Sequence, residues 1–282
     1  MNQVNVSLAQ LASPDTESKA ERIARVEQLL HDHLREHPEV ELVVLPELWA
    51  EGFFNFDRYR DLAESFGGPV MQMASRVAKT HGSYVHLGSF VERHEASTRG
   101  DARLTNTSVI IGRDGEPILT TYKTHIFGYK SDEPKFLTPG RSLPVAATDL
   151  GKMAGVVCYD LRFPGLWQEL SDRGAELVAV PAAWPAKRRE HWRVLSQSRA
   201  IEHQMWIFAC AVVGTQRGVE LCGSSQIINP LGEVLARAAD DREEIITAPV
   251  DLGLSAQWRA EFPVYADRLS NYRNFTDNTI DG

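Results

Sequence analysis

The chain has 282 residues, 43% of them hydrophobic, a size that fits one large α/β domain or two modest ones. Its 30 lysines and arginines against 38 aspartates and glutamates give a net charge of -8, which disfavours nucleic acid or an anionic membrane as main partner. No apolar run approaches the roughly 18 residues of a membrane span, and the N-terminal MNQVNVSLAQ lacks the features of a secretory signal. Three widely separated cysteines make no disulfide framework, so we expect a cytoplasmic protein with reduced thiols.

Short apolar runs alternate with helical patterns in the first half of the chain. Residues 4–10 predict a first strand, after which Ile23, Val26, Leu30 and Leu34 recur at helical spacing. The run ELVVL at 41–45 is too apolar for a surface strand, so we expect it to lie centrally in a sheet. The remaining elements predicted here are a helix over 69–81 and strands over 83–91, 103–112 and 116–122.

A turn signal and a long loop follow from the same region. Asp114-Gly115 lies between the last two strands and is typical of a hairpin, which makes the sheet mixed. Residues 124–142 show no periodicity and carry two glycines and two prolines. Because loops of this length inside compact domains are more often functional than idle, we expect this one to border a site.

The second half repeats the alternation of strands and helices. It predicts, in order, a strand over 152–157, a helix over 164–173, a strand over 176–181, a helix over 187–204 and strands over 206–213, 224–229 and 243–249. No linker or short repeat divides the chain, so we predict a single domain over 1–282 with two sheets packed face to face and helices outside. The tail from about 255 to 282 is a candidate for packing against a second subunit, and a loosely ordered terminus is the alternative.

Cys158 ends an apolar strand in GVVCYDLRFPG and is followed by a turn and a helix. A cysteine in such a position is usually an inert core residue. However, strand, turn and helix in this order are also the context of a nucleophile elbow, where backbone N–H groups can hold an oxyanion. The helix terminus would favour the thiolate.

Two further strand ends carry an acid and a cation. Glu47 follows a strand in VVLPELWAEGF, where partial desolvation would raise its pKa toward that of a thiol. Lys123 ends another strand in TTYKTHIFGYK, as the long loop begins. Each alone is compatible with a solvated surface residue. Together, an acid, a cation and a thiol at one rim are what acyl transfer at a carbonyl requires.

These segments resemble the Glu, Lys and Cys signatures of the carbon–nitrogen hydrolase (nitrilase) superfamily: LPELWAEGF, YKTHIFGY and GVVCYDLRFPGLWQEL. EPKFLTPG, PAAWP and GSSQIINPLGEVL fit as well, in the same order along the chain. The resemblance implies a four-layer αββα sandwich that pairs through its helices into an αββα–αββα homodimer, with no metal and no organic cofactor.

The resemblance also implies roles for individual residues. Glu47 would be the general base, Cys158 the nucleophile and Lys123 the cation that stabilises the oxyanion together with the Tyr159 backbone N–H. Glu133 matches the second glutamate of the family, which positions the substrate and the lysine. A solvated loop acid is the alternative for Glu133.

The segment CYDLRFP is most similar to the omega-amidase branch, whose members release ammonia from dicarboxylate monoamides such as 2-oxoglutaramate and 2-oxosuccinamate. Arg162 and Arg188 are candidates for binding the distal carboxylate, and Trp184 for lining the pocket. Alternatives are a deaminated-glutathione amidase, an N-carbamoyl amidohydrolase or a nitrilase. A thiol redox protein or a non-catalytic binding protein represents other classes, but neither accounts for Glu47 and Lys123.

The remaining polar and thiol residues have structural interpretations. We expect Asp160 to pair with Arg162 and hold the turn, and Arg199 to pair with Glu202 on one helix. Cys210 and Cys222 are predicted to be inert. The sequence contains no HExxH, P-loop or GxGxxG motif and no pair of CxxC motifs, so nothing in it supports a metal or a nucleotide.

Overall fold

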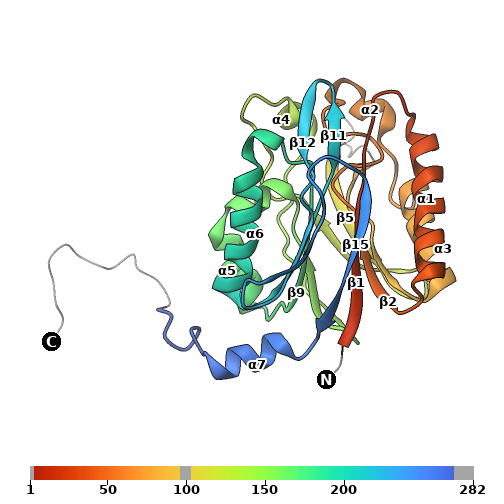
Figure 1. Cartoon of the computed structure of the whole chain (residues 1–282). Coiled ribbons are helices and arrows are strands. Elements are labelled where there is room, and N and C mark those ends of the chain that lie inside the picture. Colours follow the sequence, from red (N-terminus) through yellow and green to blue (C-terminus); the bar gives the residue numbers. More distant parts are fainter. Residues whose placement is uncertain (1–2, 96–102, 270–282) are drawn as a thin grey trace, which may run out of the picture.

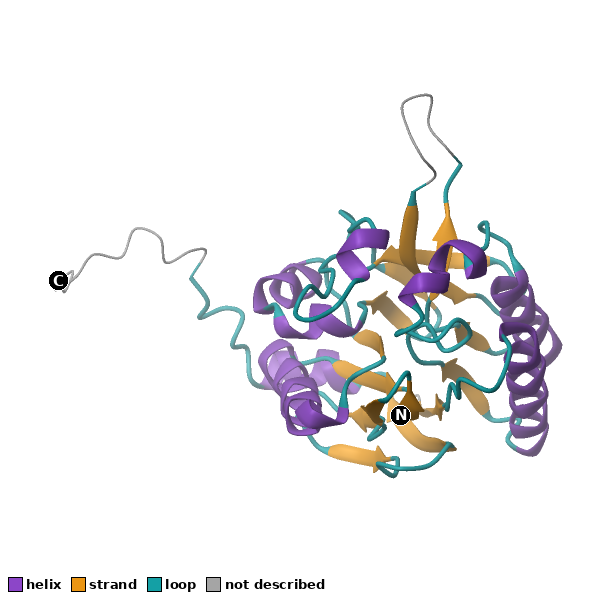
Figure 2. Ribbon diagram, turned by 90° about the horizontal axis from the view of Figure 1, so that it is seen from above, coloured by secondary structure: helices purple, strands orange, loops and turns teal. Residues whose placement is uncertain are grey.

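Two β-sheets lie face to face at the centre of the protein, and helices cover their outer faces (Figures 1 and 2). The computed structural model describes residues 3–95 and 103–269. The first sheet is built from β1 (Gln3–Gln10), β2 (Val40–Val44), β3 (Tyr84–His86), β4 (Phe90–Arg93), β5 (Leu104–Ile111), β6 (Pro117–Tyr122) and β15 (Glu244–Asp251). The second is built from β7 (Ala146–Thr148), β8 (Gly151–Gly155), β9 (Leu177–Ala182), β10 (Trp206–Ala211), β13 (Gln226–Ile228) and β14 (Val234–Arg237).

The strand order of each sheet places parallel strands at its centre. The first sheet runs β15-β1-β2-β3-β5-β4, with β6 beside β5, and the second runs β14-β13-β10-β9-β8-β7. β1, β2 and β3 run parallel to one another, as do β8, β9 and β10, whereas the pairs outside these two groups are antiparallel. The carboxyl ends of the parallel strands in one sheet therefore meet at one edge, where side chains from separate segments can converge.

Helices α1 (Lys19–Glu36) and α3 (Pro69–His81) pack on the first sheet, and α5 (Pro164–Asp172) and α6 (Arg189–His203) pack on the second. The shorter helices are α2 (Tyr59–Leu62), α4 (Glu133–Phe136), α7 (Leu254–Glu261) and the 3-10 helices at Phe56–Arg58, Cys158–Arg162 and Ala186–Arg188. No helix in the described residues is long and apolar enough to cross a membrane.

Three buried clusters correspond to the three contacts between layers. Val26 and Val77 of the helices share one cluster with the first sheet. Leu8 of the first sheet and Phe208 of the second belong to the cluster between the sheets. Trp167 belongs to the cluster between the second sheet and its helices. The predicted αββα sandwich is therefore confirmed.

The structure divides the predicted strand over 83–91 into β3 and β4. Gly88 lies between them with φ +75°, and a Cβ added there would lie 1.9 Å from the Pro46 carbonyl oxygen. Only glycine allows so close an approach of the two backbones. The bend in this strand therefore supports the segment that carries Glu47.

Other predicted boundaries also shift. The predicted strand over 206–213 ends at Ala211, and Val213 begins a separate hairpin of β11 (Val213–Gln216) and β12 (Val219–Cys222). Strands β7 and β14 were not predicted, and the predicted loop 124–142 contains α4.

The start of the C-terminal tail forms α7 and packs on its own chain. Arg259 donates a hydrogen bond of 2.8 Å to the Ala175 carbonyl, and the Tyr265 hydroxyl donates one of 2.6 Å to the His203 carbonyl. Residues 270–282 lie outside the described residues, so the packing of the tail against a second subunit stays a prediction.

Candidate active site

Two strand ends and the long loop bring Glu47, Lys123 and Glu133 into one fully buried cluster. Glu47 follows β2, Lys123 directly follows β6, and Glu133 begins α4 in the long loop. Lys123 Nζ donates to Glu47 Oε1 at 2.9 Å and to Glu133 Oε1 at 2.7 Å. All three side chains have 0% exposure to solvent. The interpretation of Glu133 as a solvated loop acid is therefore wrong.

Hydrogen bonds from three sides fix the Glu47 carboxylate. Besides Lys123, the Asn106 side-chain amide donates to Oε1 at 2.9 Å, and the Ala183 backbone N–H donates to Oε2 at 2.8 Å. Asn106 lies on β5 of the first sheet, whereas Ala183 follows β9 of the second. Both sheets therefore hold the same carboxylate, which leaves it little freedom to rotate.

Two carboxylates around a single ammonium give this cluster a negative balance. Burial disfavours the charge on Lys123, but the carboxylates of Glu133 and Glu47 hold its pKa above the ordinary value for lysine. Burial raises the pKa of Glu133, the Lys123 ammonium opposes this rise, and Glu47 adds to it. The Lys123 ammonium also lies 5.0 Å from the centre of the Phe53 ring. The amine is consequently charged and held in place.

Cys158 lies beside this cluster at the first residue of the 3-10 helix Cys158–Arg162, three residues after β8 ends. Its φ of +49° is a left-handed conformation that costs a non-glycine residue about 1 kcal/mol or more, as at a strained turn. The side chain is buried next to the Glu47 carboxylate. The strained turn therefore aims the thiol at the acid.

The expectation that the turn favours a thiolate is wrong. Burial raises the pKa of the Cys158 thiol, the negative charge of Glu47 raises it further, and the Lys123 ammonium offsets only part of this. In addition, α5 begins at Pro164, so the thiol does not lie at an α-helix N-terminus. The raised pKa favours the protonated thiol, so reaction at the sulfur requires a base.

Cys158 lines a narrow cavity with aromatic walls and two arginines. Arg162 stacks over the Trp184 ring, with its guanidinium carbon 4.6 Å from the ring centre, and Arg188 lies 5.5 Å from the centre of Phe127. Arg162 and Arg188 both line this cavity. Burial and the positive charge of Arg188 lower the pKa of Arg162. Trp184 and Arg162 therefore line the cavity that contains the thiol, and so does Tyr159.

Asp160 does not pair with Arg162, which corrects the predicted contact. Its carboxylate accepts hydrogen bonds from the Val157, Thr124 and His125 backbone N–H groups and from His125 Nδ1. Arg162 instead lies 3.2 Å from His191 Nδ1. The turn is held by the segment after Lys123 rather than by its own arginine.

Two other structural expectations are confirmed. Arg199 Nη1 donates to Glu202 Oε2 at 2.5 Å on α6. Cys210 and Cys222 are buried, and burial raises the pKa of both thiols, which disfavours the reactive thiolate.

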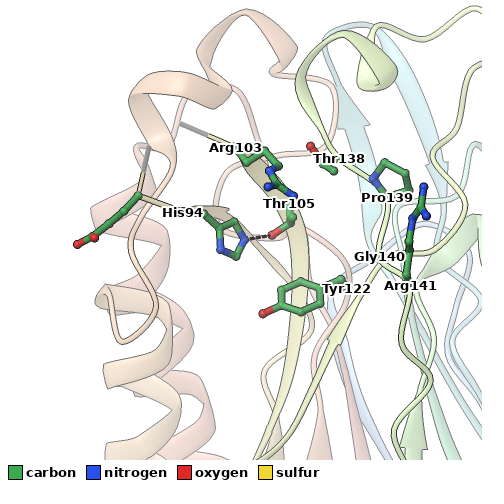
Figure 3. A pocket seen from close by; sticks show the side chains of 9 residues that line it. His94, Arg103, Thr105, Tyr122, Thr138, Pro139, Gly140 and Arg141 are labelled. Carbon is green, nitrogen blue, oxygen red and sulfur yellow. Dashed lines mark hydrogen bonds between the residues drawn. The ribbon is translucent and has the colours of Figure 1, made fainter. Parts of the chain in front are cut away.

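A larger cavity lies on the side of β5 and β6 that faces away from the buried cluster of Glu47, Lys123 and Glu133. Figure 3 shows the residues that line it. Thr105 and Tyr122 line it, whereas Asn106 and Lys123, the next residues on the same strands, belong to the buried cluster. Successive strand residues point to opposite faces of a sheet, so this cavity and the buried cluster lie on opposite faces of β5 and β6 and have no lining residue in common. Its lining contains no cysteine and no partner for Cys158.

Sequence reasoning missed Asn106 and His125. Asn106 is part of the sequon NTS in the run LTNTSVII, which the sequence predicts as a strand, and its side chain is completely buried. An amide inside such a run was the available signal, because a buried amide needs a polar partner. His125 gives no local signal, since its partner Asp160 is 35 residues away.

In the described residues, no three His, Cys, Asp or Glu side chains group as ligands for a metal ion. The prediction that the protein uses no metal and no organic cofactor stays a prediction.

A two-sheet sandwich with a thiol, a carboxylate and an ammonium at one end defines a class of hydrolases that act on carbon–nitrogen bonds outside peptides. The family model described as carbon-nitrogen hydrolase matches residues 5–260, and the chain belongs to this family.

Similar proteins agree with this assignment. The chain is 34% identical over 273 residues to the 2-oxoglutaramate amidase of Paenarthrobacter nicotinovorans, which covers 95% of this chain and 90% of that protein. It is 30% identical over 283 residues to the deaminated glutathione amidase of Dictyostelium discoideum, covering 95% of each. The crystal structure of Saccharomyces cerevisiae Nit3, described as a member of branch 10 of the nitrilase superfamily, superposes with a TM-score of 0.82 and 28% identity over 97% of each chain.

Proposed function

We propose that the protein is an omega-amidase that hydrolyses the terminal amide of short dicarboxylate monoamides, such as 2-oxoglutaramate and 2-oxosuccinamate, through a thioester on Cys158. The observation that carries this proposal is the position of Lys123 Nζ, 2.9 Å from Glu47 and 2.7 Å from Glu133, beside a buried thiol that lines a cavity. Acyl transfer needs a nucleophile, a base and a stabilised oxyanion, and these residues can supply all three.

In the first half of the reaction Glu47 takes the thiol proton as Cys158 Sγ attacks the amide carbon. The oxygen of the tetrahedral intermediate accepts hydrogen bonds from the Lys123 ammonium and the Tyr159 backbone N–H. Glu47 then returns the proton to the leaving nitrogen, ammonia departs, and a thioester remains on Cys158. The raised pKa of the thiol explains why a base must act in this step.

In the second half a water molecule attacks the thioester carbon while Glu47 takes its proton. The intermediate collapses to a carboxylic acid, and the Cys158 thiolate regains its proton from Glu47. The product then gives its remaining acidic proton to solvent and leaves as the carboxylate. Glu133 does not touch the substrate carbon in this scheme. It binds the Lys123 ammonium and keeps it aimed at the oxyanion.

The two arginines of the cavity support an anionic substrate. Arg162 and Arg188 line the same space as Cys158, and in the described residues neither is within salt-bridge distance of an acidic side chain. A substrate with an amide at one end and a carboxylate at the other would place the amide at the thiol and the carboxylate between the guanidinium groups. The 2-oxoglutaramate amidase among the similar proteins acts on a compound of this kind by its name.

Deaminated glutathione is the second candidate substrate, because an amidase of that name is 30% identical to this chain. It is a longer molecule than a dicarboxylate monoamide. The narrowness of the cavity and the two arginines near the thiol favour the shorter substrate.

We also propose that the enzyme is a cytoplasmic homodimer. The outer surface of α6 exposes Val194 (57%) and Ile201 (54%), and the neighbouring turn and strand expose Leu231 (41%) and Leu235 (43%). This apolar patch is suited to a second copy of the chain. The free thiols of the described chain are compatible with a reducing compartment. In sedimentation velocity, Ile201→Asp should yield monomer, whereas a dimer as stable as that of the parent would contradict the use of this surface.

Ammonia release from a panel of amides tests the substrate. The panel contains 2-oxoglutaramate, 2-oxosuccinamate, deaminated glutathione, an N-carbamoyl amino acid and an aliphatic nitrile. We expect the highest kcat/KM for the two omega-monoamides. Arg162→Met and Arg188→Met should each raise KM for them by about tenfold, since a charge-assisted hydrogen bond is worth roughly 1.5–3 kcal/mol.

Arg173→Met is the matched control, because Arg173 pairs with Glu169 at the surface and does not line the cavity. A panel without preference for omega-monoamides would overturn the substrate proposal. An unchanged KM in both cavity variants would overturn the role of the arginines.

A further inference from the structure

His125 and Asp160 form a hydrogen-bonded pair next to the candidate active site, and the role inferred for this pair rests on the proposed function of that site. The Asp160 carboxylate is almost completely buried and accepts four hydrogen bonds from two separate segments. Its Oδ2 accepts from the Val157 N–H at 3.2 Å and from the Thr124 N–H at 3.3 Å, and its Oδ1 accepts from the His125 N–H at 2.8 Å. The fourth bond is the shortest and comes from His125 Nδ1 at 2.7 Å.

The contact between His125 and Asp160 links the two segments that carry Lys123 and Cys158. His125 lies two residues after Lys123, and Asp160 lies two residues after Cys158. The contact therefore joins the segment that positions the amine to the turn that positions the thiol. These segments come from different sheets, since β6 belongs to the first and β8 to the second.

The geometry of the imidazole fixes its donor. A carboxylate oxygen can only accept, so Nδ1 of His125 carries a hydrogen toward Asp160. The ring is also held flat on Phe163, with a centroid distance of 3.6 Å and an interplanar angle of 7°. Phe163 is the last residue before α5, so the ring packs on the residue that ends the turn.

The left-handed backbone at Cys158 explains why such a link would be needed. Strained φ values persist only where surrounding contacts over-determine them. Asp160 bonds to Val157 on one side of the cysteine and to His125 on the other segment, which restrains the turn from two directions. His125 itself does not line the cavity with the thiol, so it does not meet the substrate.

We propose that His125 is a positioning residue, which acts through Asp160 to hold the Cys158 thiol in register with Lys123 and Glu47. Its hydrogen bond, rather than its ring, performs this role. Loss of the Nδ1 donor leaves the cavity intact but loosens the distance between thiol and ammonium. Misplacement of reacting groups by about 1 Å can cost roughly 100-fold in rate.

Two substitutions separate the hydrogen bond from the stacking. His125→Phe keeps a flat ring on Phe163 but lacks the donor, whereas His125→Asn keeps an N–H donor near the position of Nδ1 but lacks the ring. We expect His125→Phe to lower kcat by roughly tenfold to 100-fold with KM within threefold, and His125→Asn to stay within threefold in both. Thermal unfolding of both variants provides the measure of folding.

The rate of Cys158 alkylation by iodoacetamide is the second measurement, and it requires no amide substrate. We expect slower alkylation in His125→Phe and a normal rate in His125→Asn, so this result holds even if the physiological substrate is a different one. Cys158→Ala tests the proposed function separately, because it must abolish turnover whatever His125 does. A kcat for His125→Phe within threefold of the parent, or a His125→Asn protein as impaired as His125→Phe, overturns the positioning role.

Discussion

Lys123 Nζ donates a 2.7 Å hydrogen bond to Glu133 Oε1 at a place where neither side chain reaches solvent. A second carboxylate, Glu47, binds the same amine from the other side. One cation between two acids makes Lys123 necessary for the charge balance of the interior, in addition to the role in the reaction that we propose for it. Substitutions in this cluster should therefore change both stability and rate, and the two effects can be measured apart.

Lys123→Met should leave two buried carboxylates without a counter-ion. We expect a loss of about 3–5 kcal/mol in the free energy of unfolding at pH 8, the usual result of breaking a buried ion pair. Protonation of one acid relieves the repulsion, so the loss should shrink as the pH falls toward 5. Urea unfolding at the two pH values measures this, and an equal loss at both would contradict the charge balance described here.

Glu133→Gln should separate positioning from base chemistry. The substitution keeps the size of the side chain and leaves Glu47 in place, but it removes the charge that binds the ammonium. We expect kcat to fall by roughly 100-fold, comparable to the loss of one oxyanion donor, with KM within threefold. A variant with normal kcat would show that Glu47 alone orients Lys123.

Asn106→Leu should slow the reaction through Glu47. The substitution removes the amide donor to Oε1 and should lower kcat by about tenfold, since a hydrogen bond to a charged group is worth about 1.5–3 kcal/mol. Thr105→Val is the matched control, because Thr105 is the adjacent residue on β5 and faces the larger cavity of Figure 3. Equal losses in the two variants would mean that the effect comes from the strand and not from the contact with Glu47.

Two buried histidines predict how stability depends on pH. Burial lowers the pKa of His86 and of His203 to about 4, below the ordinary value of about 6.5. Between pH 4 and pH 6.5 these two histidines are protonated in the unfolded chain but not in the folded chain. Stability is therefore full above pH 6.5 and falls as the pH drops toward 4, by up to about 3 kcal/mol for each histidine.

His203→Leu checks this dependence, because in the described residues neither ring nitrogen of His203 has a hydrogen-bond partner. The variant should lose less stability than the parent between pH 7 and pH 4.5 in urea unfolding. An identical pH profile would mean that His203 titrates normally in the folded protein.

The fold and the centre of the site could largely be predicted from the sequence. Apolar runs identified the central strands, and residues at their ends identified Glu47, Lys123 and Cys158, because strand ends are where side chains of parallel sheets converge. The split at Gly88 was not predictable, since it depends on a contact with Pro46, which follows the neighbouring strand β2. The hairpin of β11 and β12 was partly hidden, because the apolar run of β10 continues into it.

Contacts that depend on three-dimensional distance were beyond sequence reasoning. The partner of Asp160 was expected within its own turn and proved to be His125 of another segment. The predicted preference of Cys158 for the thiolate was also wrong. Burial and the charge of Glu47 determine the direction of its pKa shift, and the helix that follows Cys158 does not. Local patterns identify candidate reactive residues, whereas the pKa shifts of these residues depend on neighbours that only folding brings together.

The central claim is that Cys158 carries the acyl group of the amide as a thioester. Acid quenching of the wild-type enzyme during turnover of 2-oxoglutaramate, followed by peptide mass spectrometry, tests it most directly. We predict an added acyl group on the peptide that contains Cys158, no such group in Cys158→Ala, and no ammonia release by that variant. An acyl group on a different residue, or continued ammonia release by Cys158→Ala, would contradict the account.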